Sequence, residues 1–360
     1  MKKTMTSRER VLTAISLAEP DRVPIDYGAN PGITRRLMTH YGLEANRYGD
    51  LLDALGVDFR NVGAPYTGPR LHAEIPGINV DPCWGYQTRW IENESGGYND
   101  YTGWPLKDAS EETLRNWPMP SPDDFDYSSI EAQVAAHKDK CILVGGAGHG
   151  DIINSTGMIR TMEQTMLDLA MEDEGMLAYT DRRFDIQIET LARTIEAAKG
   201  RIDMLSMGED LGSQKGPMIG LAMYRKLIRP RHQRFVDLAR SYNLPVMIHS
   251  CGSSSWAFDD FIEMGITVVD TLQPEAANMA PAYLKSRFGD RLAFHGCIST
   301  GGPVAYGTAN DVVANCRETL DIMMPGGGYC FAPTHALQDN SPTENVVAMY
   351  ETARRCGVYE

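Results

Sequence analysis

A histidine and a cysteine two residues apart, His249 and Cys251, form the clearest candidate for chemistry in this sequence. They follow the short apolar run 246–248 and precede a glycine, a pattern typical of the end of a β-strand. Residues two apart on a strand project to the same face. The pair therefore supplies an imidazole and a thiol, which are two ligands of a zinc site. The alternative is a hydrogen-bonded loop histidine beside a small packing cysteine.

A catalytic zinc ion has three protein ligands and one open position, so a third residue is needed. His335 is favoured because it follows the last predicted strand, at the expected barrel mouth. Cys330 lies within that strand, where a free cysteine also suits the core, and Cys297 is the third candidate. Either Glu209 or Asp210 could complete the set of ligands.

Other polar side chains also follow predicted strands and extend the candidate site. The candidates for catalysis, as an acid, a base or a group that orients the substrate, are Glu209, Asp210 and His149. The candidates for substrate binding are Gln214, Asp270, His295 and Cys297. Asp270 has two possible roles, because a carboxylate at this place either faces the pocket or fixes the tautomer of a neighbouring histidine.

The elements that must position these residues are strands alternating with helices. Strands followed by helices are predicted at 141–145, 203–208, 246–249, 268–272, 292–295 and 329–332, with extended pieces at 23–26 and 57–63. Helices are predicted at 6–18, 33–41, 48–55, 128–137, 157–198, 221–242, 256–264, 282–288, 309–323 and 343–356.

This alternation is typical of parallel βα units. It predicts an α/β protein with a (β/α)8 TIM barrel in a single domain, 1–360, preceded by an N-terminal helical extension. A doubly wound open sheet is the alternative, although the glycine-rich stretch 145–150 matches its phosphate-binding turn poorly. In a TIM barrel the active site lies at the carboxyl ends of the strands, where the candidate residues are found.

Residues 64–125 break the pattern because they are rich in Pro, Gly, Trp and Tyr. We expect an irregular excursion over the barrel mouth, with a short β-strand near 86–91. Its four tryptophans, which either pack internally or wall an aromatic substrate, are Trp84, Trp90, Trp104 and Trp117.

The composition argues against several classes of protein. The 360 residues carry a net charge of −14 and include no run of basic residues, which argues against nucleic-acid binding. No apolar segment approaches the ~18 residues of a membrane span. The seven cysteines are scattered and odd in number, so we expect reduced thiols in a cytoplasmic enzyme rather than a disulfide framework.

Several stretches resemble motifs of the uroporphyrinogen-decarboxylase-like superfamily. They include Gly-Glu-Asp-Leu-Gly-Ser-Gln at 208–214, Ile-His-Ser-Cys-Gly at 248–252 and Phe-His-Gly-Cys-Ile at 294–298, with further matches at 6–11, 19–24 and 326–338. The resemblance covers nearly the whole chain and implies a (β/α)8 barrel. It also implies one of two chemistries: cofactor-free decarboxylation of uroporphyrinogen, or methyl transfer by zinc enzymes that work with corrinoid proteins or coenzyme M.

The motifs favour the methyltransferase branch. True decarboxylases carry Arg-Gln-Ala-Gly-Arg-Tyr near the N-terminus, whereas residues 26–36 of this chain lack that motif. A substrate with eight carboxylates needs such cationic partners. The zinc methyltransferases carry His-x-Cys at the position of His249 and Cys251, and a further Cys in the last motif, where this chain has His335.

The resemblance therefore implies a zinc-dependent methyltransferase that demethylates a small O- or N-methylated substrate, such as a methoxylated aromatic. The methyl group would pass to a corrinoid on a partner protein, because this chain lacks a corrinoid-binding Asp-x-His-x-x-Gly motif. A homodimer is compatible with the family. The alternatives are a metal-free lyase acting on a carboxylated substrate and a barrel that binds a ligand without catalysis.

Overall fold

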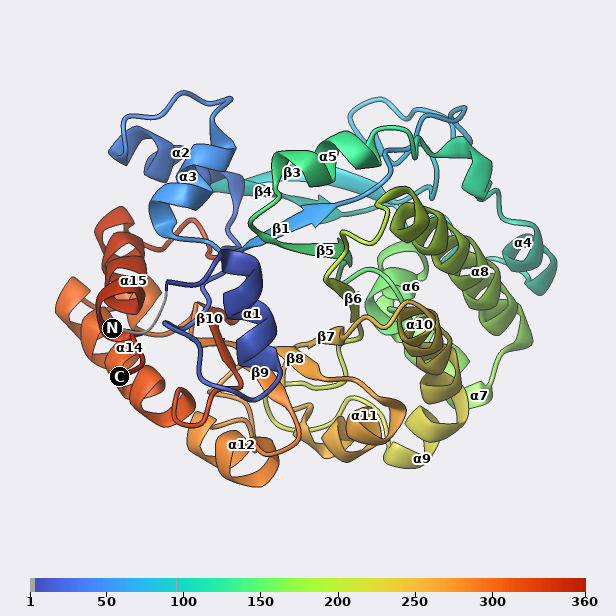
Figure 1. Ribbon diagram of the computed structural model, residues 1–360. Coiled ribbons are helices and arrows are strands. Elements are labelled where there is room, and N and C mark those ends of the chain that lie inside the picture. Colours follow the sequence, from blue (N-terminus) through green and yellow to red (C-terminus); the bar gives the residue numbers. More distant parts are fainter. Residues whose placement is uncertain (1–3, 95) are drawn as a thin grey trace.

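The computed structural model describes residues 4–94 and 96–360. Its main sheet has seven parallel strands in the order β1-β5-β6-β7-β8-β9-β10, surrounded by helices (Figure 1). The strands are β1 Phe59–Val62, β5 Cys141–Gly145, β6 Met204–Gly208, β7 Val246–Ser250, β8 Val268–Thr271, β9 Ala293–Ile298 and β10 Tyr329–Pro333. The sequential order has no switch point, so the predicted TIM-barrel class is confirmed over the doubly wound sheet.

The helices follow the prediction within a few residues at most ends. Those outside the excursion are α1 Ser7–Ile15, α2 Pro31–His40, α3 Tyr48–Leu55, α5 Ile130–Ala136, α6 Ile153–Arg160, α7 Met162–Met171, α8 Glu174–Ala197, α9 Leu221–Met223, α10 Arg229–Ser241, α11 Phe258–Met264, α12 Pro281–Phe288, α13 Pro303–Tyr306, α14 Ala309–Met323 and α15 Thr343–Cys356.

The helix predicted at 221–242 contains a π-helical stretch, Tyr224–Ile228, between α9 and α10. Pro230 follows this stretch within the first turn of α10. Proline has no backbone N–H, and its ring collides with the carbonyl four residues earlier. Locally wider winding is one way to continue a helix past such a position.

An extended segment, residues 23–26, occupies the gap between the two edge strands. The Phe331 amide of β10 donates to the Pro24 carbonyl at 2.8 Å, and on the other side the Asp58 amide donates to the Ile25 carbonyl at 2.8 Å. The extended piece predicted here therefore lies between β10 and β1, in place of an eighth regular strand.

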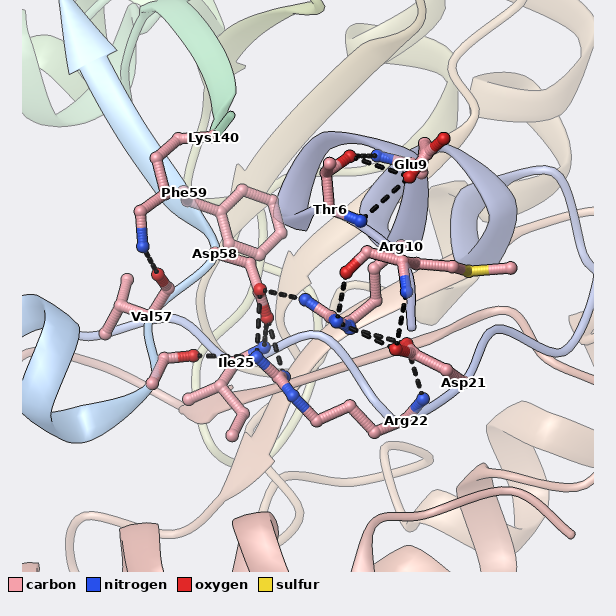
Figure 2. Close-up of polar contacts among 12 residues, drawn as sticks. Thr6, Glu9, Arg10, Asp21, Arg22, Ile25, Val57, Asp58, Phe59 and Lys140 are labelled. Carbon is pink, nitrogen blue, oxygen red and sulfur yellow. Dashed lines mark hydrogen bonds and ion pairs between the residues drawn. The ribbon is translucent and has the colours of Figure 1, made fainter. Parts of the chain in front are cut away.

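A buried ionic network fastens this segment to the rest of the barrel (Figure 2). The Asp58 carboxylate is fully buried and accepts hydrogen bonds from Arg10 at 2.7 Å, Arg22 at 2.8 Å and the Ile25 amide at 2.9 Å. Arg10 also pairs with Asp21 at 2.7 Å. Thus a single carboxylate joins helix α1, the extended segment and the start of β1.

Helix α1 covers the amino end of the barrel (Figure 1). Its apolar side packs into a cluster that includes a residue from each of the seven strands: Val11, Ala14, Ile15, Phe59, Cys141, Leu143, Met204, Met247, Val268, Ala293 and Cys330. The amino end of the barrel is thereby filled with side chains, so a substrate site belongs at the opposite, carboxyl end.

We expect Asp58→Ala to destabilise the protein by about 3–5 kcal/mol, because removing one member of a buried charge network leaves the others uncompensated. Equilibrium urea unfolding measures this change. The control is Asp123→Ala, which removes a carboxylate from an exposed ion pair with Arg193 and should leave the midpoint unchanged. An Asp58→Ala midpoint equal to that of wild type would contradict the role given to this network.

The excursion at 64–125 contains a three-stranded antiparallel sheet of β2 Asn79–Val80, β3 Gln87–Asn93 and β4 Gly96–Tyr101, then α4 Glu111–Asn116 and the 3-10 turn Pro122–Asp124. Of the four tryptophans, Trp84 lines the main cavity. Trp117 stacks on His72, while Trp90 and Trp104 are exposed. Internal packing is therefore confirmed for Trp117, while the walling of an aromatic substrate by Trp84 stays a prediction. Across the described residues, no helix has the length and apolar character needed to cross a bilayer.

Candidate active site

A cavity of about 720 Å³ opens at the carboxyl end of the barrel. One wall comes from strand ends and includes His149, Glu209, Asp210 and His249. The excursion contributes the aromatic side chains Trp84, Tyr86, Tyr101 and Phe125 to the lining. The lining therefore combines polar strand-end residues with aromatic residues of the excursion, which covers the mouth as expected.

Three potential metal ligands converge at the edge of this cavity. The Nε2 atom of His249 lies 3.4 Å from the Cys251 Sγ and 3.8 Å from the Asp210 Oδ1. One potential ligand atom from each residue lies within 4.8 Å of the other two. The predicted pairing of His249 with Cys251 is thus present, and Asp210 joins it from the neighbouring strand end.

Tight loop packing holds this group in place. The Cys251 amide donates to the Asp210 carboxylate at 2.7 Å, and the Glu209 amide donates to the His249 carbonyl at 2.9 Å. Gly252 has a φ of +69°, and a Cβ there would lie 2.1 Å from the Gly212 carbonyl oxygen. Only glycine suits that position, which explains the glycine directly after His-x-Cys.

Asp270 lies between two histidines. Its carboxylate accepts from His249 Nδ1 and from His295 Nδ1, each at 2.6 Å, and the Nε2 atom of His295 lies 3.2 Å from Asp26. This geometry matches the second predicted role of Asp270, that of fixing a histidine tautomer. With Nδ1 engaged, His249 presents Nε2 to Cys251 and Asp210.

Burial and mutual contact shift the pKa values of His249, Asp270 and His295 in opposite directions. Burial lowers the pKa of His249, but the Asp270 carboxylate more than offsets that effect and raises it well above its usual value. The same opposition raises the pKa of His295 to about 10. Burial raises the pKa of Asp270, but the two histidines together hold it far below the usual range. Asp270 is therefore a carboxylate at all ordinary pH values.

The donor set fits a zinc ion. Imidazole nitrogen, thiolate sulfur and carboxylate oxygen are all common zinc ligands, and three protein ligands with one open position are typical of catalytic sites. Burial raises the pKa of the Cys251 thiol, and the hydrogen bond with His249 partly counters this. Because His249 and Asp210 also line the cavity, a fourth ligand could approach from the substrate side.

The three residues proposed from the sequence as third ligand lie outside this group. His335 is exposed and borders the main cavity. Cys297 is buried within β9, because that strand continues to Ile298 instead of ending at His295. Cys330 packs beneath α1 at the opposite end of the barrel. Among the described residues the geometry thus favours Asp210, while His335 as a ligand remains a prediction.

Glu209 serves a different purpose from its neighbour Asp210. Its two carboxylate oxygens accept from the amides of Ile152 and Ile153, each at 2.9 Å. Burial raises the pKa of Glu209 to about 7 and that of the adjoining Asp151 to about 8. These two carboxyl groups therefore hold a proton near neutrality. Burial lowers the pKa of His149 to about 4, so this candidate catalytic side chain is neutral.

A second, smaller cavity of about 300 Å³ has Cys251 in its lining. It is lined by polar side chains that include Gln214, Gln273 and Glu275. The predicted substrate-binding residue Gln214 therefore borders this cavity rather than the larger one. The other two candidates, His295 and Cys297, are buried and line neither of these two cavities.

Three residues at the site were absent from the sequence-based candidates. Asn154 donates to Asp210 Oδ2 at 2.6 Å and so orients it. Asp26, at the end of the extended segment, contacts His295. Arg183 reaches the cavity from the middle of α8. The available signals were the position of Asp26 at the end of a predicted strand and an arginine on the apolar face of a helix.

Comparison with known proteins gives two kinds of match. The model of the family described as uroporphyrinogen decarboxylase (URO-D) matches residues 113–356, which confirms the superfamily predicted from the motifs. Among curated proteins, none matches the sequence significantly.

Among solved structures, one match supports the fold. A methyltransferase from Methanosarcina mazei superposes with a TM-score of 0.67 at 17% identity, over 98% of this chain and 99% of the other. An endo-1,4-β-xylanase from Penicillium canescens gives a TM-score of 0.40 at 7% identity, over 69% and 86% of the two chains. At 17% identity the similarity to the methyltransferase concerns the fold alone.

Proposed function

The chain belongs to the uroporphyrinogen decarboxylase family, and we propose that within this family it is a zinc-dependent methyltransferase. The observation that carries the proposal is the convergence of Asp210, His249 and Cys251 at the edge of the main cavity. A solved structure that superposes over 98% of this chain is described as a methyltransferase, which agrees with this reading.

The cavity lining argues against a porphyrinogen substrate. A decarboxylase acting on many carboxylates needs several cationic contacts. Among the described residues that line the main cavity, Arg183 is the one arginine or lysine, and the acidic side chains Asp151, Glu209 and Asp210 outnumber it. Four aromatic side chains from the excursion also line the cavity. These features suit a small methylated compound, such as a methoxylated aromatic.

The residues at the site would have separate roles in metal binding, substrate orientation and proton holding. Asp270 accepts from Nδ1 of His249, so that Nε2, once it has lost its proton, can serve as a ligand together with Cys251 and Asp210. A zinc ion held there would supply Lewis acidity toward the leaving oxygen or nitrogen. The aromatic wall would orient the substrate, and the Asp151–Glu209 pair holds a proton beside it.

The balanced reaction needs one partner. The methyl group would pass to the cobalt(I) of a corrinoid on another protein, whose electron pair forms the new bond to carbon. The substrate oxygen keeps the electron pair of the broken C–O bond and takes up a proton. We place that partner at the barrel mouth, because the candidate metal ligands are reached from the cavity there.

The test is a zinc analysis of purified protein combined with a methyl-transfer assay. The assay follows demethylation of methoxylated aromatics in the presence of cob(I)alamin by the change in corrinoid absorbance. We expect about one zinc per chain and zinc-dependent transfer. Metal-free protein that releases CO2 from a carboxylated substrate would instead support the lyase alternative.

A further inference from the structure

Arg183 is a buried cation on the wall of the main cavity. Arg183 is 1% exposed and lines the same cavity as His249 and Asp210. Its Nη1 donates to the Tyr86 hydroxyl at 3.0 Å, and its Nη2 contacts the Asp151 backbone carbonyl. Its Nε has no hydrogen-bond partner. Both acceptors that it does contact are neutral groups.

The other buried arginines behave differently. Among the described residues, three more arginines are buried, and each one forms an ion pair with at least one carboxylate: Arg10 with Asp21 and Asp58, Arg60 with Asp53, and Arg160 with Asp168. No carboxylate lies within ion-pair distance of Arg183 among these residues. Arg183 is the most buried of the four, yet it lacks the carboxylate partner that the others have. This matters because a buried charge is costly unless it is paired.

The carboxyl groups nearest to Arg183 are already engaged. Asp151 accepts from the amides of Asn154 and Ser155, and Glu209 accepts from those of Ile152 and Ile153. Both carboxyl groups thus accept from amides at the amino end of α6, where backbone N–H groups favour such acceptors. Because burial also raises the pKa of Asp151 to about 8, this carboxyl group does not neutralise Arg183 near pH 7.

We propose that Arg183 binds the carboxylate of a methoxylated aromatic acid, the ring of which lies against Trp84, Tyr86 and Tyr101. This inference rests on the proposed function and names its substrate class. An arginine offers planar, charge-assisted hydrogen bonds to a carboxylate. Because Nε has no hydrogen-bond partner and the two groups that Arg183 contacts are neutral, its positive charge is free to bind an anion. One carboxylate per substrate also agrees with one cation in the cavity lining.

The test compares 4-methoxybenzoate with its neutral analogue 4-methoxyacetophenone by isothermal titration calorimetry. We expect wild type to bind the acid about 10- to 100-fold more tightly, as for a hydrogen-bonded charged contact. Arg183→Gln should remove that preference and leave binding of the neutral analogue unchanged. Arg193→Gln is the matched control, since Arg193 is on the same helix but pairs with Glu189 and Asp123 on the surface.

Two results would overturn the inference: equal binding of both compounds by wild type, or an acid preference that persists in Arg183→Gln. The wild-type comparison holds even if Arg183→Gln does not fold, and Arg183→Lys, which keeps the charge, should retain part of the preference. Different results separate failure of this inference from failure of the proposed function. Methyl transfer from neutral anisoles without preference for acids leaves that function intact, whereas selective acid binding without methyl transfer leaves the Arg183 assignment intact.

Discussion

Replacing Cys251 with Ser is expected to reduce bound zinc from about one per chain to less than about a tenth, and to lower methyl transfer on the order of 10³-fold. The reason is that the thiolate sulfur is the softest donor in the group, and it lies 3.4 Å from His249 Nε2. A serine hydroxyl remains protonated at neutral pH and is a poor zinc ligand. Inductively coupled plasma mass spectrometry of the purified variant measures the zinc content.

The matched control is Cys356→Ser, which changes a partly exposed cysteine at the end of α15, far along the chain from the candidate ligands. It should bind zinc and react as wild type does. Near-ultraviolet circular dichroism separates loss of metal from loss of fold. If Cys251→Ser keeps both its zinc and its methyl-transfer activity, Cys251 is not a ligand and the zinc site lies elsewhere. Wild-type protein that binds no zinc would instead favour the metal-free lyase.

The barrel could be predicted because its signals are local. Apolar runs such as 246–248, followed by amphipathic helices, repeat along the chain. Each strand and the helix after it can therefore be predicted from their own residues alone. The His249–Cys251 spacing belongs to one strand and its loop, so it needed no tertiary information. For Asp270 the sequence left two roles open, facing the pocket or holding a histidine, and its contacts with two histidines match the second.

The third ligand depends on tertiary packing. Asp210 reaches the site because the loops after β6 and β7 cross closely at Gly212 and Gly252, and no residue spacing encodes that crossing. Cys297 appeared to follow a strand that in fact continues through it to Ile298. Arg183 was missed because it lies in mid-helix, where a single charged residue is usually solvent-exposed.

The competing candidates Asp210 and His335 can be separated by paired variants. Asp210→Asn is expected to weaken zinc binding at least about 100-fold, because it removes the negative charge while keeping the size of the side chain. His335→Ala should change zinc affinity by less than about 10-fold, since His335 is exposed and lies outside the cluster of candidate ligands. Competition with a chromophoric zinc chelator gives both affinities in the same assay.

The opposite ranking would favour the third ligand inferred from the sequence motif. His335 lines both cavities, the larger together with His249 and the smaller together with Cys251, and as a ligand it would have to join them through a movement of its loop. In that case His335→Ala would lose zinc and Asp210→Asn would keep it. If both variants lose zinc, His249 and Cys251 share the ion with two further protein ligands, and substrate must then displace one of them or expand the coordination.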